Sequence, residues 1–145
     1  MRRHPLALAL ALAPALAAPL GAPALARAET ATGGAYSVEA KAATAHPGVP
    51  SAATVVITPG KGYHFNKECR TTLKLDPVSD DEAPALLSAK DAGVKVEDSG
   101  ASFEVRFTAR TAGPKDMTGM LSFAVCTAST CEPRKHPVTL HIDVK

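Results

Sequence analysis

Tryptophan is absent from this chain of 145 residues, and cysteine occurs only three times, at Cys69, Cys126 and Cys131. Without tryptophan, the buried Trp on an inter-sheet disulfide that marks antibody domains is excluded. No C-x-x-C or H-x-x-x-H spacing is present to indicate a structural zinc site. The sequence also lacks a Gly-rich phosphate loop, a Ser/His/Asp signature, a paired-carboxylate motif and internal repeats. These absences leave the cysteines as the main candidates for chemistry.

Long apolar runs are also scarce, and the one that is present lies at the N-terminus. Arg2 and Arg3 precede an almost pure Ala/Leu/Pro stretch, and Ala26-Arg27-Ala28 is a small-x-small cleavage site. Three prolines interrupt the stretch, whereas a spanning helix needs about 20 unbroken apolar residues. We therefore expect residues 1–28 to be a cleaved signal peptide, which predicts a periplasmic or secreted protein with no membrane span after cleavage. No cysteine precedes Cys69, so no site for lipid attachment lies near the cleavage point.

The apparent basic charge of the chain belongs to this signal. The whole chain has 16 basic and 14 acidic residues, and the signal contributes Arg2, Arg3 and Arg27 with no acidic residue. The mature chain therefore has 13 basic and 14 acidic residues. Binding of nucleic acid needs a clustered basic face, which the sequence does not indicate, so we expect no nucleic-acid partner.

After a flexible lead-in at residues 29–35, the mature chain is predicted to form one domain of short strands over residues 36–145. Apolar and polar residues alternate with period two in most segments, as in strands with one buried face. Only Asp80–Ala89 favours a helix, which Pro84 limits to a turn or two. Seven or so strands with Gly/Pro turns predict an all-β, immunoglobulin-like antiparallel sandwich. The expected strands lie around residues 36–41, 53–58, 71–76, 94–97, 103–108, 121–125 and 138–144.

Cys126 and Cys131 flank a four-residue loop and are expected at facing ends of a hairpin. Strand parity places Cys126 opposite the Leu/Phe/Val face, so we expect it to point outward and the disulfide to be accessible. Closing so short a loop stabilises the fold by about 2 kcal/mol, against roughly 4 kcal/mol for a bridge from Cys69 to Cys126. From these residues alone, a structural and a redox-active disulfide both remain open.

Cys69 is the odd thiol. A lone cysteine in an oxidising compartment is buried and inert, pairs between chains, or is reactive. Pairing with Cys126 or Cys131 in another oxidation state is a further alternative. His64 and His136 complete the set of soft candidate metal ligands, but their spacing does not support a site, so we expect neither a metal nor a cofactor.

Two segments resemble a known family. Gly62-Tyr-His-Phe-Asn66, followed by Thr72-Leu-Lys-Leu75, resembles the G-Y-H-x-N … x-L-K-L stretch of its members. Val125-Cys-Thr-Ala-Ser-Thr-Cys-Glu-Pro133, followed by the alternating residues 137–144, resembles their C-terminal cysteine hairpin. The family is the N-terminal periplasmic domain of the transmembrane thiol:disulfide interchange reductase DsbD, also described as a disulfide bond corrector domain. The resemblance covers most of residues 36–145.

The resemblance implies an immunoglobulin-like sandwich whose hairpin carries a redox-active cysteine pair. Cys126 and Cys131 would be that pair, with Cys131 forming the mixed disulfide with partners and Cys126 resolving it. The chemistry is attack of a thiolate on a disulfide sulfur, so access and thiolate fraction control its rate. Arg134 and Lys135 lie close enough in sequence to favour a thiolate, and Glu132 opposes them. The implied partners are thioredoxin-fold redox proteins or a membrane thiol reductase.

The sequence departs from the family in three respects. It has neither a membrane electron conduit nor a thioredoxin-like domain, so we expect the reductant to be another protein. The best-known members shield the cysteine pair with an aromatic cap loop, whereas the corresponding Val96–Phe103 is short and has no aromatic residue before Phe103. Cys69 is not part of the motif. Two hypotheses follow: an exported thiol:disulfide exchange domain, or a non-catalytic binding or structural module with a structural Cys126–Cys131 disulfide.

Overall fold

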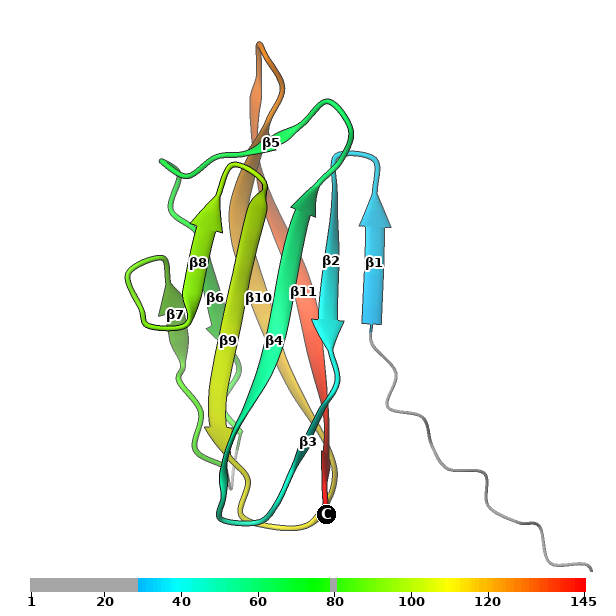
Figure 1. Cartoon of the computed structure of the whole chain (residues 1–145), viewed down its shortest axis with the longest axis vertical. Helices are drawn as coiled ribbons and strands as arrows, with labels where there is room; N and C mark the ends of the chain where they lie inside the picture. The colour runs from blue at the N-terminus through cyan, green and yellow to red at the C-terminus, as the bar shows by residue number, and fades with distance from the viewer. Residues whose placement is uncertain (1–28, 79–80) are drawn as a thin grey trace, which may run out of the picture.

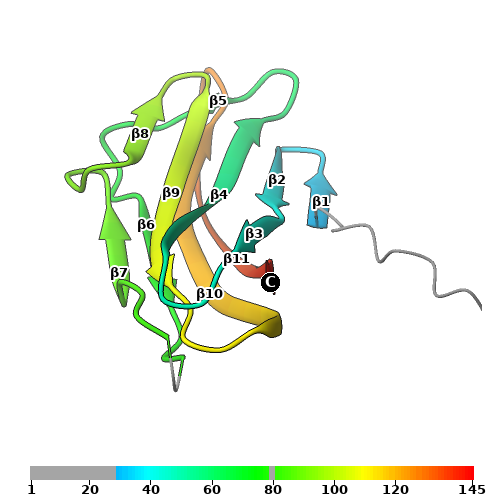
Figure 2. The same cartoon turned by 60° about the horizontal axis from the view of Figure 1, so that its bottom comes forward.

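The fold is that of a computed structural model, which describes residues 29–78 and 81–145. The expected signal peptide, residues 1–28, lies outside the described residues. The described chain forms eleven β-strands in two facing sheets (Figures 1 and 2). Within these residues, no helix has the length and apolar character needed to cross a membrane.

Each sheet combines strands from separate parts of the sequence. The first has the spatial order β1 (Glu29–Gly33), β2 (Tyr36–Lys41), β4 (Pro50–Pro59), β9 (Gly100–Thr108) and β8 (Val94–Glu97). The second has the order β3 (Ala43–Ala45), β11 (Cys131–Val144), β10 (Gly113–Cys126), β6 (Thr72–Leu75) and β7 (Leu86–Ser88), and β5 (His64–Phe65) also pairs with β10. The predicted immunoglobulin-like β-sandwich is confirmed.

The core lies between the sheets and follows the predicted alternation. On β9, Phe103, Val105 and Phe107 are buried, as expected of residues spaced by two along a strand. On β10, Phe123 stacks on Phe65 with ring centroids 5.8 Å apart and meets the ring of Tyr36 edge-on at 5.0 Å. Because full burial of such a side chain contributes roughly 1.5–3 kcal/mol, this cluster anchors β5 to the sandwich.

Two local features differ from the sequence expectations. The flexible lead-in expected at residues 29–35 contains β1, whose backbone pairs with β2. The helix expected over Asp80–Ala89 is wrong for its described part. There, Glu82 forms a bridge with Thr108, and β7 pairs with β6. Neighbouring strands satisfy these backbone groups and Leu87 is buried as a strand residue, so tertiary pairing outweighs the helical propensity of the Ala/Leu run.

The chain also changes sheets between β2 and β3. β2 pairs with β4 in the first sheet, whereas Ala43–Ala45 pairs with Ile142–Val144 of β11 in the second. This pairing is parallel, while the other strand pairs in the described residues are antiparallel. The exception is a consequence of the crossing, which carries the chain into the second sheet beside the last strand.

Beyond its contact with β3, the outer side of β11 is a sheet edge in the described structure. Pro133 and Pro137 lie on this stretch and are exposed. The carbonyl of Ala124, which is the register partner of Pro133, accepts a bond from the Asn66 N–H and so points away from β11. In such an antiparallel pair the backbone groups of both residues point outward. The proline nitrogens therefore face the free edge, where a proline costs no ladder bond.

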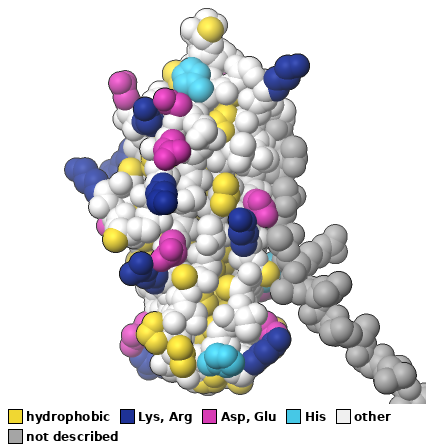
Figure 3. All heavy atoms as spheres, in the orientation of Figure 1, with side chains coloured by type: hydrophobic (Ala, Val, Ile, Leu, Met, Phe, Trp, Pro, Cys, Tyr) yellow, Lys and Arg dark blue, Asp and Glu magenta, His cyan; other side chains and the backbone are white. Residues whose placement is uncertain are grey.

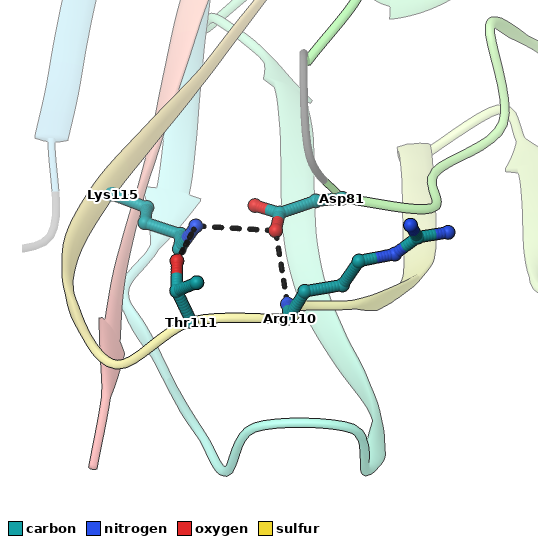
Figure 4. Close-up of polar contacts among 4 residues, drawn as sticks. All are labelled: Asp81, Arg110, Thr111 and Lys115. Carbon is teal, nitrogen blue, oxygen red and sulfur yellow. Dashed lines mark hydrogen bonds and ion pairs between the residues drawn. The ribbon is translucent and has the colours of Figure 1, made fainter.

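A buried carboxylate fastens the segment before β7 to the start of β10 (Figure 4). The Asp81 side chain is only 2% exposed, and its Oδ1 accepts bonds of 3.1 Å from both Lys115 Nζ and the Arg110 backbone N–H. Lys115 Nζ also donates to Thr111 Oγ1 at 3.0 Å. We call Asp81, Lys115, Thr111 and the Arg110 backbone the Asp81 clasp.

Candidate functional site: the cysteine hairpin

Strands β10 and β11 form a long hairpin that projects beyond one end of the sandwich (Figure 1). Cys126 and Cys131 are register partners at its tip and form a disulfide, with Cα atoms 4.0 Å apart. The connecting loop is closed by a bond of 2.8 Å from the Thr127 N–H to the Thr130 carbonyl. Thr127 Oγ1 accepts a second bond, 3.1 Å, from the Thr130 N–H. The predicted position of the pair at facing ends of a hairpin is confirmed.

The two cysteines differ sharply in exposure. Cys126 is 1% exposed, whereas Cys131 is an exposed residue. The expectation that Cys126 points outward into solvent is therefore wrong. Strand parity still places its side chain opposite Phe123, but β5 pairs with β10 beside it and Asn66, the residue after β5, contacts its sulfur. Because Cys126 is buried and Cys131 is exposed, an incoming thiolate can approach this disulfide from the side of Cys131.

Asn66 is the residue that contacts both sulfurs. Its Nδ2 lies 3.4 Å from Cys126 Sγ and 3.6 Å from Cys131 Sγ. Its Oδ1 accepts bonds from the Glu68 N–H at 2.9 Å and the Cys69 N–H at 3.2 Å. Since those donors require the carboxamide oxygen to face them, the NH₂ group must face the disulfide. The hydrogen-bond network thus orients a donor toward the sulfurs.

The position of Asn66 follows from a turn that the sequence motif encodes. The Tyr63 N–H donates to the Gly60 carbonyl at 3.0 Å, which closes a four-residue turn. Gly62 occupies its third position with φ of 84°, a conformation that a type II turn requires and that glycine adopts without steric cost. The turn leads the chain into β5, where Phe65 pairs with Val125 and His64 pairs with Cys126.

The residues after β5 are fastened to the same end of the molecule. The Asn66 N–H donates to the Ala124 carbonyl at 3.0 Å, and the Phe65 N–H donates to the Asp98 carbonyl at 2.9 Å. Lys67 also forms an ion pair of 3.1 Å with Asp98. The hairpin between β8 and β9, which corresponds to the cap stretch Val96–Phe103, therefore contacts the β5 segment, while Asn66 contacts the sulfurs.

The charged residues that follow Cys131 on β11 are Glu132, Arg134 and Lys135. Arg134 forms an ion pair with Glu132, so this guanidinium is balanced by a carboxylate two residues away. Lys135 is exposed and pairs in register with Ser122. The sequence expectation that Arg134 and Lys135 favour a thiolate stays a prediction.

The remaining candidate ligands do not assemble. Cys69 is a free, exposed cysteine, so the interpretation of a buried, inert thiol is wrong. His64 is exposed, whereas His136 Nδ1 lies 3.3 Å from the Tyr36 hydroxyl on the other side of the hairpin. Among the residues that the structure describes, no three His, Cys, Asp or Glu side chains are grouped as a metal site requires.

Comparisons with known proteins add similarity of fold at low sequence identity. No family model matches the chain, and no curated protein matches it. Among solved structures, the chain is similar to AggA, the major subunit of aggregative adherence fimbriae type I from Escherichia coli. That match has 8% identity and a TM-score of 0.36, and covers 82% of this chain and 96% of AggA.

A second similar structure is the ASH/PapD-like domain 7 of human CEP192. It has 14% identity and a TM-score of 0.36, and the match covers 90% of this chain and 92% of that domain.

Proposed function

We propose that this protein is an exported thiol:disulfide exchange domain that passes electrons to or from thioredoxin-fold partners through Cys126 and Cys131. The observation that carries the proposal is the asymmetry of the disulfide: Cys131 is exposed, while Cys126 is 1% exposed and lies against a directed N–H donor from Asn66. An attacking thiolate needs one accessible sulfur, and the leaving sulfur benefits from a donor that stabilises its negative charge.

The reaction begins when a partner thiolate attacks Cys131 Sγ. The Cys126–Cys131 bond breaks, its electron pair remains on Cys126 Sγ, and this thiolate takes up a proton from solvent. The partner's second thiolate then attacks the partner sulfur of the mixed disulfide and releases Cys131 as a thiolate, which is also protonated. Two electrons and two protons reach the cysteine pair, and the partner dithiol becomes a disulfide. The reverse sequence oxidises this protein.

The resemblance to the DsbD N-terminal domain supports the same proposal from another direction. The Gly62–Asn66 motif and the cysteine hairpin are far apart in the sequence, yet β5 pairs with β10 beside Cys126, and Asn66 contacts both sulfurs. The two segments that carry the resemblance are therefore neighbours around one disulfide. A periplasmic or secreted location, with a thioredoxin-fold protein or membrane thiol reductase as partner, belongs to this proposal.

A structural role for the disulfide is the second candidate, favoured by the burial of Cys126. A redox titration of the intact mature protein separates the two. Exchange predicts a potential near the isomerase range, about −180 mV, whereas a structural bond lies below about −300 mV. A value in the lower range would contradict the exchange proposal.

A trapping experiment tests the assigned order of the cysteines. Cys126→Ala leaves the exposed Cys131 without its resolving thiol, so mixed disulfides with periplasmic proteins should accumulate. Cys131→Ala is the matched control, and both variants carry Cys69→Ser because Cys69 is free and exposed. The control should capture far less, because its remaining thiol, Cys126, is buried. Equal capture by the two variants, or capture by the control alone, would refute Cys131 as the point of attack.

A further inference from the structure

A hollow on the outer face of the second sheet combines positive charge with exposed apolar side chains. It has a volume of ≈ 400 Å³ and lies over β6, β7, β10 and β11. Leu86 and Met120, which are 49% and 40% exposed, are two of the few large apolar side chains that the described surface exposes. We call this surface the basic groove, and the residues used in the argument are Arg70, Lys74, Leu86, Met120, Ser122 and Lys135.

The charge of the groove is of one sign. Arg70, Lys74 and Lys135 line it, and none of its lining residues is acidic. In the described part of the chain, no ion pair joins these three cations to a carboxylate. The mature chain as a whole is nearly balanced, with 13 basic and 14 acidic residues. On the face of the first sheet, acidic and basic side chains are interspersed (Figure 3).

The groove shares a face of the hairpin with the accessible cysteine. Cys126 pairs with Cys131, and four residues back along β10, Ser122 pairs with Lys135. Because side chains spaced by an even number point to the same face, Lys135 and Cys131 lie on one face of β11. Four residues of strand span roughly 13 Å. Cys131, Pro133 and Lys135 are all exposed, so an open strip connects the disulfide to the groove.

We propose that the basic groove docks an acidic segment of the redox partner, with carboxylates beside an apolar side chain, roughly 13 Å from the partner's reactive cysteine. The proposal rests on the exchange function above and names the chemistry of its partner. Carboxylates pair with Arg70, Lys74 and Lys135, and the apolar side chain packs on Leu86 and Met120. Such complementarity mainly accelerates encounter and orients the incoming thiolate toward Cys131.

Two synthetic dithiol peptides test the proposal on the intact mature protein. Both carry Cys-x-x-Cys followed, after a four-residue extended spacer, by either Glu-Leu-Glu or Lys-Leu-Lys. At low ionic strength, the acidic peptide should reduce the Cys126–Cys131 disulfide about tenfold faster, and high salt should remove most of this difference. The double variant Lys74→Glu/Lys135→Glu should abolish or invert the preference.

The matched control is Lys41→Glu/Lys95→Glu, which reverses two exposed charges on the first sheet and should keep the preference. Dithiothreitol, which is uncharged, should reduce all variants at equal rates. Equal rates for the two peptides in the unaltered protein would overturn the groove, as would binding of anionic lipid vesicles through Lys74 and Lys135 without a peptide preference. A potential below about −300 mV would instead remove the exchange function itself, so the two failures are distinguishable.

Discussion

Strand β10 begins beside the Asp81 clasp and ends at the cysteine hairpin. The two ends differ in how far the polar or sulfur-containing group is shielded from solvent. At the first end, the Asp81 side chain is 2% exposed, and its carboxylate accepts hydrogen bonds from Lys115 and from the Arg110 backbone N–H. At the second end, Cys126 is as buried as Asp81, but its covalent partner Cys131 is open to solvent. The Asp81 contacts thus join two segments of the fold, whereas the disulfide has one exposed cysteine, as the proposed exchange reaction requires.

The largest effect is expected when the Asp81 clasp is removed. Asp81→Ala removes the carboxylate that accepts from the Lys115 ammonium and the Arg110 N–H. Lys115, which is only 20% exposed, then keeps the neutral Thr111 hydroxyl but no counter-charge. Breaking such a buried pair costs about 3 kcal/mol, which lowers the melting temperature by roughly 10 °C. Thermal unfolding followed by circular dichroism measures the change, and the reduction potential of the hairpin should not move.

Glu82→Gln is the control, because Glu82 pairs with Arg110 in an exposed ion pair worth under about 1 kcal/mol. Equal destabilisation by the two substitutions would mean that Asp81 behaves as an ordinary surface charge.

At the other end of β10, Asn66→Asp tests the contact of the carboxamide with the sulfurs. Asn66→Asp keeps the oxygen that accepts the Glu68 and Cys69 N–H bonds but replaces the sulfur-facing NH₂ with a carboxylate oxygen. A thiolate at Cys126 then loses a donor and gains a negative neighbour, so the reduced form is disfavoured. A loss of about 1.4 kcal/mol corresponds to a potential about 30 mV lower, measured in a glutathione redox buffer.

Asn66→Ala should lower the potential less, because it removes the donor without adding charge. An unchanged or higher potential in Asn66→Asp would show that the carboxamide does not act on the sulfurs.

The smallest effect is expected at Cys69. This thiol is free and exposed, so Cys69→Ser should change the free energy of unfolding by less than about 0.5 kcal/mol and leave the potential unaltered. It should also remove any disulfide-linked dimer seen on a non-reducing gel. A shifted potential would place Cys69 within the exchange cycle as a third participant.

Much of the fold was predictable because alternation reports burial directly. Residues such as Phe103, Leu121 and Leu140 lie in the core on the parity that the sequence indicates. The failed helix at Asp80–Ala89 shows the limit: a short Ala/Leu run carries no record of the β6 edge that recruits Leu86–Ser88 into a strand. Long-range pairing decided that segment, and local propensity did not.

The pairing of the two cysteines could be predicted from the sequence, whereas their surroundings could not. Spacing alone placed Cys126 opposite Cys131. Parity could not show that β5 pairs beside Cys126 and brings Asn66 against its sulfur, so the burial of Cys126 was missed. Asn66 stood in the quoted motif without a role, and Gly62 was the available signal, because a glycine that closes a turn predicts a chain reversal. The basic groove was also missed, since Arg70, Lys74 and Lys135 come together only through strand register.

The two prolines on the free edge of β11 bear on how a partner can leave. A sheet edge with its full set of N–H groups invites strand addition, which joins chains through many backbone bonds and releases them slowly. Pro133 and Pro137 remove two of those donors beside Cys131. Under the proposed exchange function, a partner would thereby be restricted to side-chain contacts around one transient covalent bond, and the complex would dissociate when that bond is resolved. If the protein is the exchange domain proposed above, the prolines favour turnover, because such a domain must serve many partner molecules in succession.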